Sequence, residues 1–284
     1  MAIADDMKVN PYLQVLLAVL IMGSSGVFIK FLSLPPLVLS FFRMAIPTAL
    51  LFIYFSIRGV NLFRYPVKLM LLGSVLNAAR IFLFITSYTY TSISNAVIIL
   101  YTWPVYATIL SMLFLKEQVP NRNKVLLALP IIGIVLMFIN QPFNTENRDF
   151  LGMSAMLLSA LIYAMTIIVF KRESHKYSGF ETVFFQNLAG GFIFLPFLLQ
   201  ENITFTIEQL STLLLFGVLI GIIAFGLFFS ALKKIKASTI SFLTYLEVLV
   251  ATMYGVIIFD ENLSWNTMFG GGLIIVSTLL LKKK

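Results

Sequence analysis

Long apolar runs, separated by short charged connectors, follow one another from Pro11 to the carboxyl terminus. Within each run the apolar residues are nearly continuous, whereas a half-buried strand would alternate apolar and polar positions. A helix needs ~20 apolar residues to cross the ~30 Å hydrocarbon core of a bilayer. We therefore expect an all-α polytopic membrane protein with ten transmembrane helices, over residues 11–30, 35–57, 66–88, 93–115, 123–140, 151–170, 181–200, 209–232, 238–259 and 266–281.

The composition agrees with this class of protein. Hydrophobic residues make up 60% of the chain and charged residues 11%, whereas a soluble protein carries ~25% charged residues. The chain has no cysteine, which excludes disulfides and thiolate chemistry. Its only histidine, His175, lies in a charged connector, where a solvated side chain is the usual outcome. We expect no metal site, no cofactor and no catalytic residue, and the sequence contains no G-x-x-x-x-G-K-[ST] motif for ATP.

The basic residues are concentrated in alternate connectors and at both ends of the chain. They include Lys8, Arg58, Arg64, Lys68, Lys116, Arg122, Lys124, Lys171, Arg172, Lys176, Lys233, Lys234, Lys236 and Lys282–Lys284. The intervening connectors carry mainly acidic residues, namely Glu146, Asp149, Glu201, Glu208, Asp260 and Glu261. Because lysine and arginine stay on the cytoplasmic side, both termini are predicted to be cytoplasmic, in the plasma membrane (the inner membrane of a bacterium).

This distribution also explains the net charge of +8. The basic connectors face anionic lipid of the inner leaflet, so the expected partners are the lipid bilayer and a small-molecule substrate, and no nucleic acid. The first run follows an acidic segment, "MAIADDMKVN", and lacks a small-residue cleavage site. We therefore expect it to be a retained span rather than a signal peptide.

The second half of the chain repeats the first. "YTWPVYATILSMLFLKE" (101–117) returns as "YLEVLVATMYGVIIFDE" (245–261), and "FFR" (41–43) as "FFQ" (184–186). At a shift of 144 residues the pairs include Ser94/Ser238, Tyr101/Tyr245, Glu117/Glu261, Gly73/Gly217 and Phe84/Phe228. Five spans per copy reverse the entry side, which predicts an inverted 5+5 repeat: residues 1–140, a connector over 141–150, and residues 151–284. Many secondary transporters are built this way, although a duplication kept only for folding is the alternative.

The repeated segments carry a family resemblance. "TYTSISNAVIILYTWPVYATILSMLFLKEQV" and "ALKKIKASTISFLTYLEVLVATMYGVIIFDENL" resemble the two repeat signatures of the drug/metabolite transporter superfamily, EamA-like branch. "IKFLSLPPLVLSFFRMAIP" is similar to that family's segment from the first to the second span. The resemblance implies ten helices, an inverted repeat, and export or uptake of small organic solutes. One departure is that the central proline of the signature is present only as Pro104, with Val248 in the second copy.

Three charged residues fall inside predicted spans: Arg43, Arg80 and Glu247. Each costs ~2.5–3.5 kcal/mol at the centre of a membrane helix, so a position facing lipid is unfavourable. We expect the three to face a cavity or one another. Arg80 shares a helical face with Asn77 and Ser87, a polar stripe that is typical of a cavity wall.

These observations define candidate substrate-binding residues: Arg80, Asn77, Glu247, Arg43, Tyr101, Trp103, Gln186 and Thr244, with Ser24 and Ser25 as further lining. For Arg43 and Arg80 the alternatives are an ion pair that positions helices and direct contact with solute. We favour solute contact for Arg80 and the ion pair for Arg43. Glu247 either neutralises an arginine or exchanges protons. Because a guanidinium suits a carboxylate, solutes with an anionic group are favoured, zwitterionic amino acids included.

Three further residues are candidates for conformational gating. Pro104 removes a backbone hydrogen bond in mid-span and is expected to kink the fourth helix. Gly217 and Gly221 form a G-x-x-x-G pair that permits close helix approach in the eighth. Static packing explains these residues equally well.

The sequence therefore favours a secondary transporter that moves small organic metabolites, such as amino acids or other carboxylate-bearing or amphipathic solutes, by alternating access, with export as the favoured direction. The alternatives are a proton-coupled exporter of cationic or drug-like compounds and a membrane channel. A membrane enzyme is disfavoured because no acid/base, nucleophile or metal-ligand cluster appears. The sequence does not indicate the oligomeric state, and a monomer is compatible with the expected fold.

Overall fold

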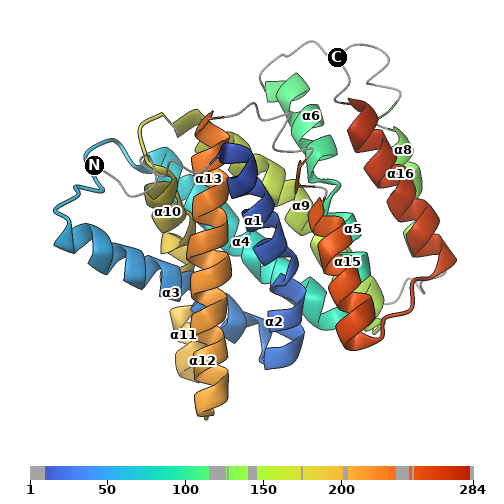
Figure 1. Cartoon of the computed structure of the whole chain (residues 1–284), viewed down its shortest axis with the longest axis horizontal. Coiled ribbons are helices and arrows are strands. Elements are labelled where there is room, and N and C mark those ends of the chain that lie inside the picture. Colours follow the sequence, from blue (N-terminus) through green and yellow to red (C-terminus); the bar gives the residue numbers. More distant parts are fainter. Residues whose placement is uncertain are drawn as a thin grey trace.

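A computed structural model gives the fold and describes residues 10–114, 126, 128–139, 146–173, 175–200, 204–234, 243–244 and 246–281. The helices of the first half are α1 (Pro11–Gly23), α2 (Ser25–Leu32), α3 (Pro36–Ile57), α4 (Lys68–Tyr90), α5 (Ile93–Leu100), α6 (Trp103–Phe114) and α8 (Ala128–Phe138). The second half contributes α9 (Arg148–Glu173), α10 (Gly179–Ile193), α11 (Leu195–Gln200), α12 (Ile207–Phe216), the π-helix η1 (Gly217–Ala224), α13 (Phe225–Lys234), α15 (Leu246–Phe259) and α16 (Trp265–Leu281). Figure 1 shows them packed side by side, and the described residues contain no strand.

Every apolar run of the sequence contains helix, as predicted. Five helical stretches are long and apolar enough to cross a membrane: Pro11–Leu32, Pro36–Ile57, Lys68–Tyr90, Arg148–Glu173 and Ile207–Leu232. The remaining apolar helices are shorter than 18 residues over their described parts. The protein is thus an all-helical polytopic membrane protein.

Several runs are interrupted rather than continuous. Between α1 and α2, the hydroxyls of Ser24 and Ser25 donate to the carbonyls of Ile21 (2.7 Å) and Met22 (2.6 Å), and such local bonds compete with regular helix. Between α5 and α6, Thr102 likewise donates to the Ile99 carbonyl at 2.8 Å. These polar interruptions occur in the middle of the apolar runs.

The break between α5 and α6 agrees with the kink predicted for Pro104. Within the expected span over 93–115, α5 ends at Leu100 and α6 begins at Trp103. Pro104 has no backbone N–H for the Leu100 carbonyl four residues earlier, so an interruption of the helix is expected in this turn. Its side chain lies outside the described residues.

The two halves of the chain pack against each other along most of their length. Helix α4 lies along α9, α8 along α16, and α3 along α10. Helix α1 lies between α13, η1 and α15, while α5 packs on α15 and α9. The interface between the halves is consequently the centre of the molecule.

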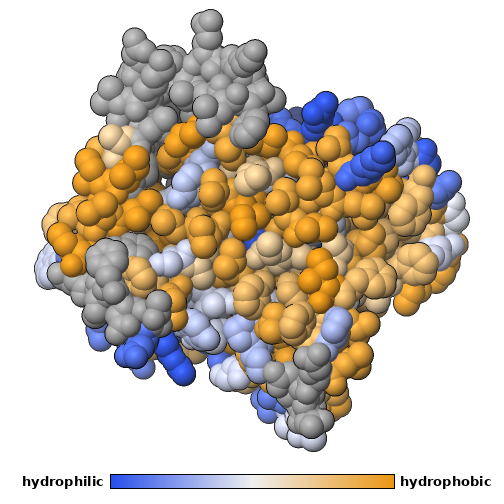
Figure 2. All heavy atoms as spheres, turned by 180° about the vertical axis from the view of Figure 1, so that it is seen from behind, coloured by the Kyte–Doolittle hydropathy of each residue, from blue (hydrophilic) through white to orange (hydrophobic). Residues whose placement is uncertain are grey.

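Burial is reversed relative to a soluble protein. Large apolar side chains are exposed on the helices, including Ile57 (79%), Leu199 (75%) and Phe269 (63%). Figure 2 shows apolar residues across most of one face, with hydrophilic residues gathered towards its margins. Polar side chains such as Asn77, Arg80 and Gln186 are instead buried. This arrangement suits a bilayer, where lipid solvates the apolar exterior.

Glu261, which follows α15, joins three separate elements. Its carboxylate accepts hydrogen bonds from the backbone N–H groups of Ile93 (2.6 Å) and Ser94 (3.1 Å) at the start of α5, and from the Ser94 hydroxyl (3.0 Å). Lys30 of α2 lies 3.5 Å from the same carboxylate. The side chain is only 8% exposed. It caps the helix dipole of α5 from the other half of the chain.

Candidate functional site

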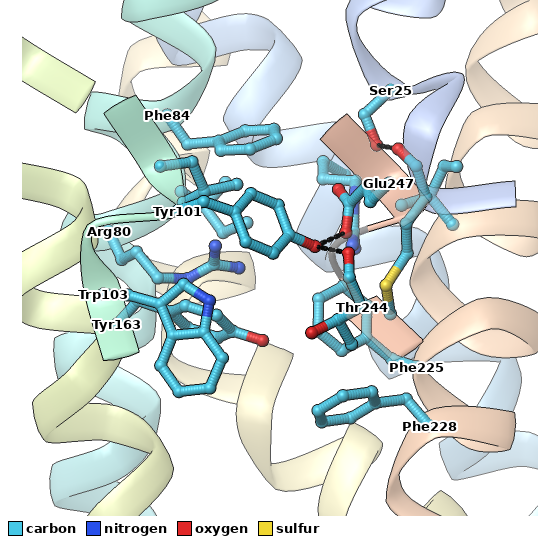
Figure 3. A pocket seen from close by; sticks show the side chains of 15 residues that line it. Ser25, Arg80, Phe84, Tyr101, Trp103, Tyr163, Phe225, Phe228, Thr244 and Glu247 are labelled. Atoms are coloured by element: carbon cyan, nitrogen blue, oxygen red, sulfur yellow. Dashed lines mark hydrogen bonds between the residues drawn. The ribbon is translucent and has the colours of Figure 1, made fainter. Parts of the chain in front are cut away.

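A cavity of about 560 Å³, open space at its mouth included, lies between the two halves. Its walls come from α1, α2, α3, α4, α5, α6, α9, η1, α13 and α15, together with Tyr101 and Thr244. The lining residues are Met22, Ser25, Arg43, Arg80, Ile81, Phe84, Leu100, Tyr101, Trp103, Tyr163, Ile220, Phe225, Phe228, Thr244 and Glu247. Figure 3 shows the side chains converging on this space. All three charged residues predicted to be intramembrane therefore reach one cavity.

Arg80 is held firmly in the cavity wall. Its Nε donates to Asn77 Oδ1 at 3.0 Å, one turn earlier on α4. Its guanidinium carbon lies 4.7 Å from the ring centroid of Tyr163 and 5.7 Å from that of Phe84. The backbone carbonyl of the same residue accepts a hydrogen bond from Ser159 of α9 at 3.1 Å. These contacts fix the Arg80 side chain, which points towards the middle of the cavity in Figure 3.

Asn77 and Gln186 lie behind Arg80 and are not among the lining residues. The Asn77 amide donates to the Gln186 backbone carbonyl at 2.9 Å, and Gln186 Nε2 donates to Asn77 Oδ1 at 3.4 Å. Both residues are at most 2% exposed. The structure thus places them as supports of Arg80, whereas the sequence had suggested direct solute contact.

Arg43 has different surroundings. It lies on α3 with 3% of its surface exposed, and its guanidinium carbon lies 5.5 Å from the ring centroid of Phe225 and 5.7 Å from that of Phe216. Cation–π contacts of this kind stabilise a buried guanidinium. The Nη1 atom makes no hydrogen bond to any described residue. Arg43 therefore brings a charge to the cavity wall, and its Nη1 donor is buried without a partner among the described residues.

Glu247 lies across the cavity from Arg80 in Figure 3 and is 8% exposed. The Tyr101 hydroxyl lies 2.8 Å from Glu247 Oε2 and also contacts the Thr244 carbonyl. A phenol carries one proton, so the two acceptors share a single donor. These contacts join the end of α5 to α15.

The predicted ion pair between Glu247 and an arginine is absent. Among the described residues, neither Arg43 nor Arg80 has a carboxylate within 4.0 Å. The correction has a geometric reason for Arg80: Asn77 holds its guanidinium, whereas the Tyr101 hydroxyl contacts the Glu247 carboxylate on the facing side of the cavity.

Aromatic rings form much of the remaining wall. Trp103 and Tyr163 meet edge to face at 5.3 Å, and Phe225 and Phe228 do so at 6.4 Å. The sequence did not single out Tyr163 and Phe225 as lining residues. With 28 Phe and 11 Tyr residues in the chain, an aromatic residue alone does not indicate a position in the cavity wall. Phe228 had a usable signal, since it is the repeat equivalent of Phe84 and both line the cavity.

Gly217 and Gly221 lie in η1 and face α3. A side chain at Gly217 would meet Ile46 at 2.7 Å, and one at Gly221 would contact Pro47 and lie 3.0 Å from Arg43 Nη1. These glycines therefore permit close approach of η1 and α3. This close contact is what the alternative of static packing predicts for the two glycines. The gating role of Gly217, Gly221 and Pro104 stays a prediction.

Similarity to known proteins extends over nearly the whole chain. The pseudopaline exporter of Pseudomonas aeruginosa is 24% identical over 252 residues, which cover 88% of this chain and 87% of the relative. An uncharacterized transporter of Archaeoglobus fulgidus is 26% identical, with 94% of each chain covered. The S-adenosylmethionine uptake transporter of Rickettsia bellii is 25% identical and covers 73% of this chain and 71% of its own length.

The fold is also known. A solved crystal structure superposes on 95% of this chain and 95% of its own with a TM-score of 0.65, at 15% identity. The model of the EamA-like transporter family matches the sequence twice, over residues 10–139 and 150–282. On this evidence, the protein belongs to the EamA-like transporter family.

Proposed function

We propose that the protein is a secondary transporter that moves small organic solutes bearing a carboxylate, such as amino acids, by alternating access. Membership in a transporter family supports the general class. The observation that carries the finer proposal is the cavity itself, because residues of both halves line it and it contains two arginines and one acid. A solute held there contacts both halves, so their relative movement can expose it to either side.

The charges in the cavity favour an anionic group on the solute. With Glu247 ionised, the three groups sum to one positive charge, and with Glu247 protonated they sum to two. A buried charge is expensive unless it is paired, and neither arginine has an acidic partner among the described residues. A carboxylate between the arginines supplies that partner and matches the fork of a guanidinium.

The packing of the helices supports the inverted repeat of residues 1–140 and 151–284, joined by 141–150. If each element is exchanged for its equivalent in the other copy, the contact of α4 with α9 becomes that of α13 with α1. The contact of α10 with α4 likewise becomes that of α3 with η1. The pairs α3–α10, α5–α15 and α8–α16 exchange into themselves. A pseudo-two-fold axis is consistent with this pattern of contacts. We propose that the axis lies in the membrane plane and that the chain has ten spans, with both termini cytoplasmic in the inner membrane.

For direction we propose export. The relatives are named both as an exporter and as uptake transporters. The exporter matches 88% of this chain and the uptake transporters 73%, which supports export. A monomer suffices for this mechanism, because both halves of the cavity wall come from one chain.

Counterflow in proteoliposomes tests the proposal. Vesicles loaded with an unlabelled amino acid should accumulate the labelled form transiently, and a channel would not produce this overshoot. Arg80→Gln should lower the rate at least about tenfold, since a charged hydrogen bond contributes ~1.5–3 kcal/mol. Arg58→Gln, which removes an exposed connector arginine, is the matched control and should leave the rate unchanged. Absence of counterflow for every amino acid and carboxylate would reject the proposal.

A second candidate, proton-coupled export of cationic or drug-like solutes, is favoured by Glu247. Its carboxylate lies in a cavity that is also lined by the rings of Phe84, Trp103 and Tyr163, and aromatic faces attract cations. In this case Glu247→Gln should abolish the pH dependence of transport. A variant that keeps the parental rate and pH dependence would exclude proton coupling through Glu247.

A further inference from the structure

The two copies of the repeat differ at a pair of equivalent contacts next to the cavity, of which only Arg43 is a lining residue. At a shift of 144 residues, Gly221 of η1 is the equivalent of Asn77 of α4, and at a shift of 143, Gln186 of α10 is the equivalent of Arg43 of α3. The structure brings each residue close to its partner from the other copy: Asn77 contacts Gln186, and Gly221 faces Arg43. These are two equivalent positions with different chemistry.

The Asn77 position is filled. The asparagine side chain occupies the space between α4 and α10, and it bonds to both the backbone and the side chain of Gln186. A third contact, to Arg80 Nε at 3.0 Å, uses the same amide oxygen. This contact also occupies one of the donors of Arg80.

The Gly221 position has no room for a side chain. A Cβ there would lie 2.3 Å from Pro47 Cγ and 3.0 Å from Arg43 Nη1, so α3 packs directly on the glycine. That nitrogen makes no hydrogen bond to any described residue. The rings of Phe216 and Phe225 face the guanidinium, but a phenyl ring offers no acceptor oxygen. A buried guanidinium donor without an acceptor costs free energy unless a ligand supplies one.

We infer that Arg43, which lines the cavity and whose Nη1 has no partner among the described residues, binds the anionic group of the solute, and that Arg80 contributes its charge from a fixed position in the wall. The inference rests on the proposed function and specifies its anion subsite. It reverses the expectation from the sequence, which assigned the ion pair to Arg43 and solute contact to Arg80. Gly221 lets Pro47 and Arg43 of α3 pack closely on η1.

The cavity contains a usable reporter for a binding experiment. The chain has two tryptophans: Trp103 lines the cavity, and Trp265 is 72% exposed on α16. In a Trp265→Phe background, fluorescence excited at the red edge reports on Trp103 alone. The probes are phenylacetate and phenylacetamide, which have nearly the same shape and differ in charge.

We expect phenylacetate to bind the Trp265→Phe protein more tightly than phenylacetamide. Arg43→Gln should weaken phenylacetate about 10- to 100-fold and leave phenylacetamide within about twofold, which is the fold-change expected from a charged hydrogen bond. Arg80→Gln should cause a smaller loss. An equal or larger loss in Arg80→Gln, or unchanged binding in Arg43→Gln, would overturn the inference, as would failure of phenylacetate to bind the parent.

The outcome separates this inference from the proposed function. If counterflow is observed but Arg43→Gln leaves the affinity for phenylacetate unchanged, the anion subsite is rejected and the proposed transport function stands. If Arg43→Gln weakens phenylacetate binding but no solute shows counterflow, the anion subsite stands and the proposed transport function is rejected.

Discussion

Individual residues at the centre of the molecule act through partners that are distant in the chain. Tyr101 reaches Thr244 and Glu247, and Asn77 reaches Gln186. Glu261 is a further case, since it accepts from Ile93 and Ser94 and pairs with Lys30. In a low-dielectric interior such contacts are strong when they are fully satisfied and costly when one partner is lost.

Glu261→Gln should lower the free energy of unfolding by about 1–3 kcal/mol, because an amide removes the ion pair and leaves a donor group facing the N–H groups of α5. The thermal midpoint of the purified protein in detergent measures this effect. The neighbouring acid, Asp260, is exposed, so Asp260→Asn is the matched control and should leave the midpoint unchanged. Equal midpoints for both variants would show that the Glu261 contacts contribute nothing.

At the scale of the helices, glycines decide how closely the two halves approach. Helices α8 and α16 cross at Gly133 and Gly270, where a Cβ on either residue would lie 2.5 Å from the backbone oxygen of the other. Small residues at such crossings let backbones pack in the membrane, where apolar side chains gain little from leaving lipid. The neighbouring Gly272 faces open space. Only one of these two α16 glycines is therefore required at the crossing.

We expect Gly270→Ala to destabilise the protein by about 1–3 kcal/mol, the usual cost of overpacking a well-packed contact. Gly272→Ala, two residues away on the same helix, should be neutral or slightly stabilising, because alanine is the better helix former. Thermal midpoints of the two variants in the same detergent give the comparison. A larger loss in Gly272→Ala would contradict the crossing seen here.

At the scale of the whole molecule, exchanging each helix for its equivalent in the other half reproduces the same helix contacts. The proposed inverted orientation of the halves follows from an odd number of spans, five, in each copy. The connector before α4 and the connector before α12 are equivalent in the repeat. The first carries Arg58 and Arg64, whereas the second leads into the acidic first turn of α12. The positive-inside rule predicts that the two connectors lie on opposite sides of the membrane.

Cysteine labelling in intact cells tests this orientation, and the absence of native cysteine makes each introduced thiol a unique site. Thr204→Cys should react with a membrane-impermeant thiol reagent added outside, and Arg58→Cys should react only after the membrane is permeabilised. Both residues are exposed, so accessibility within the protein does not limit either reaction. Labelling of both from the same side would reject the inverted repeat.

The sequence by itself determined the membrane class, the helical runs, the repeat and the three charged residues of the interior. These features depend on local run length and on the cost of placing a charge in lipid, and both can be evaluated without a fold. It also identified Tyr101, Trp103 and Thr244 as lining. The kink predicted for Pro104 agrees with the interruption between α5 and α6, which lies in the turn before the proline.

Only the tertiary structure decided which polar groups meet. Asn77 lies behind Arg80 rather than in the cavity, Glu247 pairs with Tyr101 instead of an arginine, and Tyr163 joins the wall from α9. The physical reason is that the contacts between helices, such as Asn77 with Gln186 and Tyr101 with Glu247, join residues more than 75 positions apart in the chain, so they depend on helix rotation and spacing. Glycines such as Gly221 set that spacing, and no local pattern records which side chain will occupy the space they leave.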